Sequence, residues 1–406
     1  MASTPSAAPI PPPTLLRNAH VFAPEDLGLR QLLIGGGRIL WIGEPTEAAP
    51  VIPGLDTVDL GGQRLMPGLI DAHAHVTGGG GEGGFATRVP PVPLSSFTTA
   101  GVTSVVGVLG TDDLARSPGE LLASVYALRE QGLGAWAWCG GYHVPPATLT
   151  GSVRGDIVYL DPVIGAGELA ISDHRSSQPT FDEFLRIAAD CHVAGLMTGK
   201  AGVLHLHLGD GPRGLDLVRR ALDDTELPSR VFHPTHVNRR RALFEEALQL
   251  ARRGCTVDVT AFPVEDGEDA WSAADAWERY RAAGAPPERI TISSDAGGCL
   301  PTFDGDGRLC RMDVGRSHAL VGTIRTLLER GHPLDAVLPA FTRNVARSLR
   351  LPRKGEISIG ADADLVALDA DGRVSDVMAQ GAWHVRDGEP VRVGPFESVP
   401  SSVTVP

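Results

Sequence analysis

Lysine is scarce in this chain of 406 residues, because it occurs only at Lys200 and Lys354. Lysine and arginine together supply 36 basic side chains against 49 aspartates and glutamates, which leaves a formal net charge of −13. A nucleic-acid partner favours a basic face, so this balance argues against one. We interpret the negative charge as a source of solubility.

Cysteine and long apolar segments are also sparse. The five cysteines are scattered, odd in number and not spaced as a zinc knuckle, which fits free thiols in a reducing cytoplasm. No apolar run reaches the roughly 18 residues of a membrane span. Residues 1–14 contain no basic side chain and so lack the charged region of a secretion signal. We expect a cytoplasmic protein without a membrane partner, with a flexible tail over residues 1–14.

Between residues 66 and 349, short apolar runs alternate with helix-like stretches, as in repeated strand–helix units. Eight such units favour a closed barrel over an open sheet. The expected strands are residues 69–75, 103–109, 135–140, 164–172, 203–208, 231–236, 255–261 and 290–295. The expected helices include residues 119–131, 180–194, 239–253, 270–283, 314–330 and 334–348.

Residues 15–65 and 350–398 instead hold short β-like runs separated by glycines. We expect these two ends to fold together beside the barrel. The predicted fold class is therefore α/β, with a (β/α)8 TIM barrel over residues 66–349 and a small β-sandwich domain formed by the N- and C-terminal segments.

The segment Asp71-Ala72-His73-Ala74-His75 is the most informative motif. Side chains of a strand alternate between its faces, so His73 and His75 point the same way. The glycines that follow, from Gly78 to Gly81, indicate that the strand ends here. The two imidazoles therefore lie at the carboxyl end of a barrel strand, where active sites of this fold are built.

Other predicted strands end in metal-binding side chains. His205 and His207 share the barrel-facing side of one strand; His207 is the better ligand, and His205 is expected to pack or to support a ligand. Two further strands end in His236 and Asp295. Histidine pairs with carboxylates are sufficient for a site that holds two divalent metal ions, for which zinc is the expected metal.

Two cations in one site need a bridging anion, either a carbamylated lysine or a carboxylate. Lys200 precedes a strand at the opposite end of the barrel, and Lys354 lies near the second half of the sandwich. Glu168 lies within a predicted strand and is the bridging candidate. The alternative is that Glu168 is an ion-paired carboxylate of the barrel.

Such a site predicts hydrolysis of an amide-like bond, because two metals lower the pKa of bound water and so hold a hydroxide that is a good nucleophile at neutral pH. Asp295 can take the proton of the water and pass it to the leaving amine. Tyr142 can polarise the scissile carbonyl. Glu82 is a candidate for binding a substrate ammonium, and Arg175 and Arg239 for binding carboxylates.

At these residues the chain resembles the metal-dependent amidohydrolase superfamily and, within it, the isoaspartyl dipeptidases. The resemblance covers nearly all of residues 15–398 and rests on Pro67-Gly68-Leu69-Ile70-Asp71-Ala72-His73-Ala74-His75, on residues 354–365 and on short strings around Glu82, Thr111, Tyr142, Arg175, Arg239 and Asp295. It implies that His73, His75, His207, His236 and Asp295 bind two zinc ions, and that Glu82, Thr111, Tyr142, Arg175 and Arg239 contact the substrate. It also implies a homo-oligomer, because members of this family are usually homo-octamers.

Two positions depart from the family pattern. Glu168 stands where the family has a carbamylated lysine, and the segment before it looks one residue longer, which could bring the shorter side chain to the metals. Cys299 stands where the family has a serine that helps to hold the substrate carboxylate, and a thiol is a weaker donor.

The first prediction is a binuclear hydrolase of β-aspartyl dipeptides, which are small and zwitterionic. The second prediction is a hydrolase with the same chemistry that acts on a cyclic amide or an N-acyl amino acid. The departures at Glu168 and Cys299 from the family pattern favour this alternative. A third is a catalytically silent assembly protein, against which the complete set of ligands counts.

Overall fold

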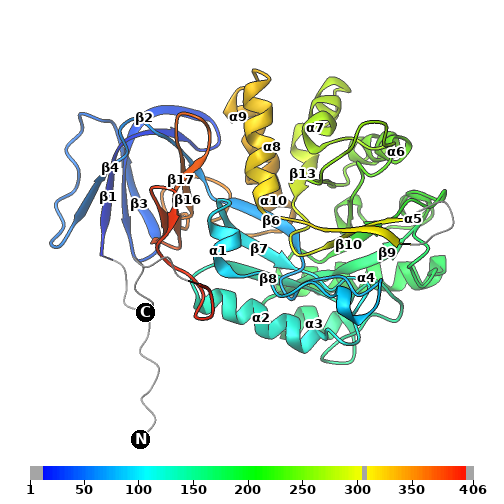
Figure 1. Ribbon diagram of the computed structural model, residues 1–406. Coiled ribbons are helices and arrows are strands. Elements are labelled where there is room, and N and C mark those ends of the chain that lie inside the picture. Colours follow the sequence, from blue (N-terminus) through cyan, green and yellow to red (C-terminus); the bar gives the residue numbers. More distant parts are fainter. Residues whose placement is uncertain (1–11, 304–308, 399–406) are drawn as a thin grey trace, which may run out of the picture.

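The computed structural model describes residues 12–303 and 309–398 (Figure 1). Two parts stand side by side in this view: a barrel with its surrounding helices, and a β-sheet part that contains the first strands of the chain in blue and the last in orange and red. No helix of the described residues is long and apolar enough to cross a membrane.

The barrel consists of eight parallel strands. The first six form one sheet in chain order, the last two pair with each other, and the strands are β6 (Leu69–Ala74), β7 (Val102–Gly107), β8 (Gly134–Cys139), β9 (Val163–Ile171), β10 (Val203–Leu208), β11 (Phe232–Thr235), β12 (Val257–Thr260) and β13 (Ile290–Ser293). Backbone hydrogen bonds close the ring, from Val237 N to Asp258 O and from Asp295 N to His73 O. This confirms the predicted (β/α)8 fold.

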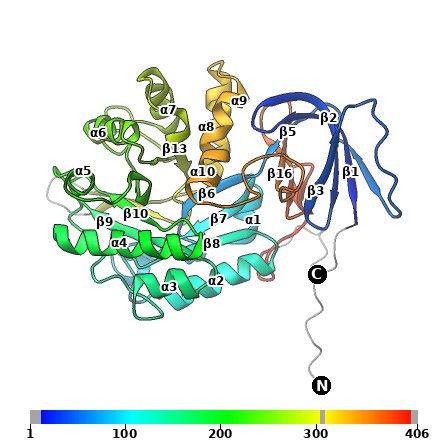
Figure 2. The same ribbon diagram turned by 180° about the vertical axis from the view of Figure 1, so that it is seen from behind.

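Helices cover the outside of the strands, and α2, α3 and α4 lie along the lower side of the barrel in Figure 2. The main helices are α2 (Pro118–Glu130), α3 (Val153–Tyr159), α4 (Phe181–Thr198), α5 (Asp216–Asp224), α6 (Arg241–Arg252), α7 (Ala273–Ala282) and α8 (His318–Glu329). Helix α4 starts at a capping box between Thr180 and Glu183, and it runs past the expected end at residue 194 to Gly199, whose φ of 76° terminates it.

Two expected helices differ from the structure. The helix expected over residues 314–330 begins only at His318, because Val314 ends an antiparallel hairpin of β14 (Cys299–Phe303) and β15 (Leu309–Val314) that lacks a clear alternation in the sequence. The helix expected over residues 334–348 is divided into α9 (Leu334–Val337), a 3-10 turn and α10 (Arg343–Ser348). Pro339 lies in that turn, where its missing N–H cannot extend a helix.

The β-sheet part joins the two ends of the chain. Its strands are β1 (Thr14–Phe22), β2 (Asp26–Gly35), β3 (Arg38–Gly43), β4 (Asp56–Asp59), β5 (Arg64–Pro67), β16 (Leu365–Leu368), β17 (Val374–Ala379), β18 (Ala382–Arg386) and β19 (Glu389–Pro390). β16 pairs with β5 and β17, so the carboxyl-terminal strands extend a sheet that begins with the amino-terminal ones. Of the tail expected over residues 1–14, residues 1–11 lie outside the described residues, and Thr14 already belongs to β1.

Candidate active site

Six buried side chains with metal-binding atoms meet at the carboxyl ends of the barrel strands. They form three overlapping groups, which are His73, His75 and Glu168; Glu168, His207 and His236; and His73, His236 and Asp295. Three of them lie within β6, β9 and β10, two directly follow β6 and β11, and Asp295 lies two residues after β13. The structure thus brings together every ligand that the sequence indicated, and their roles as ligands stay predictions.

Glu168 occupies the centre of this set because β9 carries one extra residue. Ala166 pairs with Leu204 and Leu169 pairs with Leu206, so Gly167 and Glu168 together stand opposite the single residue His205. A Cβ atom on Gly167 would lie 2.7 Å from the Cβ of His205, so the bulge requires glycine there. The bulge aims the Glu168 carboxylate between the two histidine groups.

The distances around Glu168 suit metal coordination. Its Oε1 lies 3.4 Å from His75 Nε2, and its Oε2 lies 3.1 Å from His207 Nδ1 and 3.5 Å from His236 Nε2. Asp295 Oδ1 lies 3.2 Å from His75 Nε2. Two ligand atoms about 2.1 Å from one tetrahedral ion would lie roughly 3.4 Å apart.

Two of the buried ligand atoms make no hydrogen bond to another described residue. Among the described residues, neither Nε2 of His73 nor Oδ1 of Asp295 has a hydrogen-bond partner. An unpaired buried polar atom is costly. Nitrogen and carboxylate donors in this arrangement therefore fit divalent metals of the zinc type.

The electrostatics of the set favour cations. Burial would raise the pKa of Glu168, but the imidazoles of His73 and His207 outweigh burial and hold it well below its ordinary value. Burial would lower the pKa of His75, but the Asp295 and Glu168 carboxylates outweigh burial and raise it to about 10. Both carboxylates thus stay ionised and give the site a negative potential.

Side chains behind the ligands hold them in place, and no pattern in the sequence indicated these supporting side chains. Thr260 Oγ1 lies 2.7 Å from Nδ1 of His236. The carboxylate of Asp71 accepts hydrogen bonds from the backbone N–H and the hydroxyl of Ser294, one residue before Asp295. Strands β6 and β13 are thereby tied together beneath the ligands.

A row of imidazoles continues from the site into the barrel. His73 Nδ1 lies 2.8 Å from His205 Nε2, and His205 Nδ1 lies 3.0 Å from His233 Nδ1. Burial, together with neighbouring histidines, lowers the pKa of His205 well below its ordinary value, and burial also lowers that of His233. The expectation that His205 packs or supports a ligand agrees with this contact. His233 was missed, although it pairs in register with His205 on the neighbouring strand.

The predicted substrate-binding residues lie above the ligands. Thr111 Oγ1 donates a 2.9 Å hydrogen bond to Oε1 of Glu82, and Arg175 Nη1 lies 3.5 Å from the same oxygen. Arg239 Nη1 lies 3.3 Å from His207 Nε2, and the Tyr142 hydroxyl lies 2.8 Å from His207 Nδ1. Burial raises the pKa of Tyr142 well above its ordinary value, so its hydroxyl keeps its proton.

Asp173 was not singled out in the sequence, yet it contacts two of these groups. Its Oδ2 lies 2.9 Å from His207 Nε2 and accepts a 2.8 Å hydrogen bond from Arg175 Nη2. It follows β9 by two residues, as a strand-end carboxylate, and that position was the available indication.

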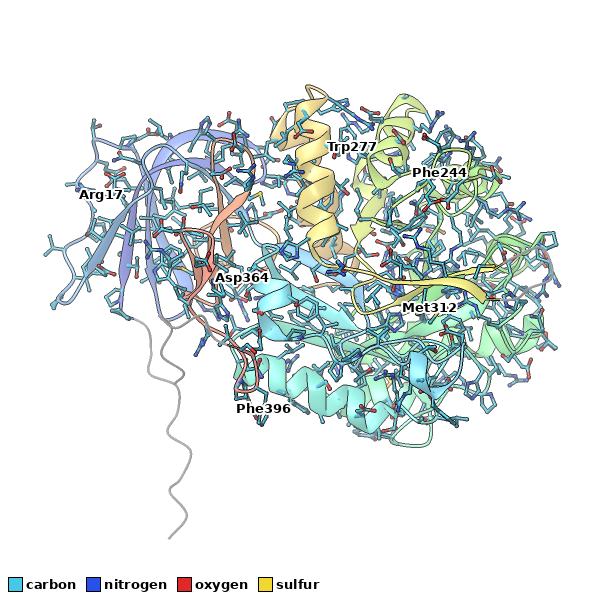
Figure 3. The ribbon with its side chains drawn as sticks, in the orientation of Figure 1. Arg17, Phe244, Trp277, Met312, Asp364 and Phe396 are labelled. Atoms are coloured by element: carbon cyan, nitrogen blue, oxygen red, sulfur yellow. The ribbon has the colours of Figure 1, made fainter. Side chains whose placement is uncertain are left out.

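Cys299 begins the hairpin that lies over this end of the barrel. Its Sγ lies 3.4 Å from Sδ of Met312, which Figure 3 labels on the yellow strand β15. Burial raises the pKa of Cys299 to about 12, so it remains a thiol. Cys299, Arg175 and Arg239 line both an inner space of about 20 Å³ beside the ligands and an outer pocket of about 510 Å³.

Neither lysine reaches the site. Lys200 Nζ donates 2.7 Å hydrogen bonds to the carbonyl oxygens of Ile157 and Leu160. Lys354 Nζ pairs with Asp364 and lies 3.1 Å from Asp362. The sequence-based placement of both lysines away from the ligands agrees with these contacts.

Comparison with known proteins identifies the family. No family model matches the chain. Imidazolonepropionase from Pseudomonas putida is 38% identical over 139 residues, which are 32% of this chain and 34% of that protein, so the chain spans about a third of the length of the curated relatives it matches.

Solved structures match over almost the whole chain. The crystal structure of a β-aspartyl dipeptidase from the thermophilic keratin-degrading Fervidobacterium islandicum AW-1, in complex with the dipeptide β-Asp-Leu, is 42% identical with a TM-score of 0.90 and covers 95% of this chain and 99% of its own. A second structure of that enzyme is 40% identical with a TM-score of 0.87 and covers 95% and 100%. The chain therefore belongs to the β-aspartyl dipeptidases of the metal-dependent amidohydrolase superfamily.

Proposed function

We propose that this protein hydrolyses the isopeptide bond of β-aspartyl dipeptides at a site for two metal ions. The observation that carries the proposal is the shared position of Glu168, whose Oε1 lies 3.4 Å from Nε2 of His75 and whose Oε2 lies 3.1 Å from Nδ1 of His207 and 3.5 Å from Nε2 of His236. Likeness to an enzyme that was crystallised with β-Asp-Leu supports the choice of substrate.

The ligand set divides into two halves. His73, His75 and Asp295 would hold one ion, His207 and His236 the other, and Glu168 would bridge them. When bound, divalent metals of this kind lower the pKa of water and polarise a carbonyl oxygen. A glutamate bridge needs no carbamylation, because the carboxylate is already ionised at neutral pH.

Proton transfer falls to Asp295. Burial would raise its pKa, but the imidazoles of His73 and His75 hold it well below its ordinary value. The ionised carboxylate can accept the proton of the attacking water and then deliver it to the leaving amine. Tyr142 keeps its hydroxyl proton and donates it as a hydrogen bond to the carbonyl oxygen of the scissile bond.

Substrate recognition follows from the charges above the ligands. A β-aspartyl dipeptide carries one ammonium group and two carboxylates. Glu82 provides a carboxylate for the ammonium group, while Arg175 and Arg239 provide guanidinium groups for the carboxylates. Glu82, Arg175 and Arg239 line one site, and this grouping of opposite charges favours a small zwitterionic substrate over a longer peptide.

Turnover assays with the zinc-loaded protein test the proposal. β-Asp-Leu should be hydrolysed faster than its α-linked isomer, an N-acyl amino acid and a hydantoin, because only β-Asp-Leu places its three charges opposite Glu82, Arg175 and Arg239. Faster turnover of the α-linked isomer, of the hydantoin or of the N-acyl amino acid would overturn the choice of substrate. No turnover of any of the four by protein that carries zinc would overturn the enzymatic function.

A further inference from the structure

The row of buried imidazoles below the metal ligands ends on a carboxylate. His233 Nε2 lies 3.1 Å from the hydroxyl of Thr291, which donates a 2.6 Å hydrogen bond to Oδ1 of Asp258. Together with the His73–His205 and His205–His233 contacts, this makes an unbroken hydrogen-bonded chain from Asp258 to His73. All five side chains are at most 2% exposed. We call this chain the histidine relay.

Asp258 determines which group donates and which accepts in each hydrogen bond of the histidine relay. An ionised carboxylate only accepts hydrogen bonds, and Asp258 accepts them from the hydroxyls of Thr235, Thr291 and Ser293. A threonine hydroxyl has one proton, so Thr291, having given it to Asp258, can only accept from His233. His233 must then carry its proton on Nε2.

The tautomer of each imidazole in the row determines the tautomer of the next one. A neutral imidazole has one donor and one acceptor nitrogen. His233, protonated on Nε2, accepts at Nδ1, so His205 must carry its proton on Nδ1 and accept at Nε2. His73 must therefore carry its proton on Nδ1, which leaves the lone pair of its Nε2 free.

That nitrogen is the one that faces the proposed metal site. Nε2 of His73 lies 3.4 Å from Asp295 Oδ1 and 3.6 Å from Glu168 Oε2, without a hydrogen-bond partner among the described residues. We propose that Asp258, acting through Thr291, His233 and His205, sets the tautomer of His73 that binds metal. Thr291 and Asp258 are then positioning residues, which act on His73 of β6 through His233 and His205.

A second contact holds the middle of the histidine relay in place. The indole ring of Trp138 stacks on His205, with ring centroids 5.0 Å apart and an angle of 13° between the planes. Its Nε1 donates a 3.1 Å hydrogen bond to the carbonyl oxygen of Ala72, next to His73. The ring of His205 therefore cannot rotate freely. The hydrogen bonds of the histidine relay can then reverse their direction only if His205 changes its tautomer.

Zinc affinity, measured by competition with a chelator, tests the inference with a matched pair of substitutions. Thr291→Val removes the hydroxyl that links His233 to Asp258. Thr235→Val is the same change at another buried threonine that donates to the same carboxylate, outside the histidine relay. Removing an outer partner of a metal ligand weakens metal binding by about 10- to 100-fold. We expect that loss for Thr291→Val, near wild-type affinity for Thr235→Val, and recovery of the affinity in Thr291→Ser, which keeps the hydroxyl.

Equal zinc affinity of the two valine variants, or no recovery in Thr291→Ser, would overturn the inference. Neutron diffraction from crystals of the zinc-loaded wild-type protein provides a readout that needs no variant to fold. Deuterium should lie on Nδ1 of His205 and on Nε2 of His233, and the opposite assignment at either ring would contradict the histidine relay. The inference depends on the proposed metal site, yet failure is distinguishable: wild-type protein that binds no zinc would overturn the proposed function itself.

Discussion

The protonation state of single residues at this site depends on the neighbouring charges as well as on burial. Asp295 and Glu168 are buried carboxylates whose pKa burial would raise, yet neighbouring imidazoles keep both ionised. Burial and the Glu168 carboxylate raise the pKa of Tyr142 by more than Arg175 and Arg239 lower it, so Tyr142 keeps its proton. The site thus places carboxylates that can accept a proton beside a hydroxyl that can donate a hydrogen bond, and amide hydrolysis requires both.

The substitution Tyr142→Phe tests the donor role. The ring is retained and the hydroxyl is lost, so substrate binding should change little while the carbonyl loses a hydrogen bond in the transition state. We expect kcat for β-Asp-Leu to fall roughly 10²- to 10³-fold. Steady-state kinetics that instead show an unchanged kcat and a raised KM would assign Tyr142 to binding alone.

At the scale of elements, the bulge in β9 brings Glu168 to the centre of the ligand set. Gly167 of this bulge packs tightly against β10. A Cβ added to Gly167 would lie 2.7 Å from both the Cβ and the carbonyl oxygen of His205. Neither atom belongs to the flexible end of a side chain, so the strands would have to separate.

Gly167→Ala should therefore lower the free energy of unfolding by about 1–3 kcal/mol, as overpacking does, and weaken zinc binding. Gly322→Ala is the control, because Gly322 lies in α8 with no atom within 4 Å of an added Cβ. Chemical denaturation should show that the control is at least as stable as wild type. A Gly167→Ala protein with wild-type stability would show that the bulge does not require glycine.

Elements with regular patterns were predictable from the sequence, whereas contacts across the barrel were not. The alternation in residues 203–208 predicted β10 with its observed bounds, and the ends of other strands differ by one or two residues. The β14–β15 hairpin was missed because it carries Pro301 and no clear alternation. Asp71, Asp173 and His233 act through partners on other strands, and no local pattern in a single sequence records which strands meet.

At the scale of the whole molecule, His384 lies where the β-sheet part contacts the barrel part. It belongs to β18, and its Nε2 would lie 3.2 Å from a Cβ on Gly132, two residues after the end of α2. Neither ring nitrogen has a hydrogen-bond partner among the described residues. Burial, with Arg392 nearby, lowers the pKa of His384 to about 3.

This contact predicts sensitivity to acid. An unfolded histidine has a pKa of about 6.5, so between that pH and about 3 the unfolded chain binds the proton that folded His384 excludes. The stabilisation is complete above about pH 6.5 and is lost as the pH falls through this window. The substitution His384→Leu should flatten the pH dependence of the unfolding free energy measured by denaturation below that pH. A variant with the same slope as wild type would show that His384 is protonated without cost in the folded state.

The central claim is that Glu168 joins two metal ions without a carbamylated lysine, and the zinc content of the purified protein tests it most directly. Protein reconstituted in buffer free of bicarbonate should contain two zinc ions per chain, because the bridge is a glutamate already ionised at neutral pH. Glu168→Ala should retain at most one. Two zinc ions per chain in Glu168→Ala, or a requirement for bicarbonate in the wild-type protein, would contradict the account.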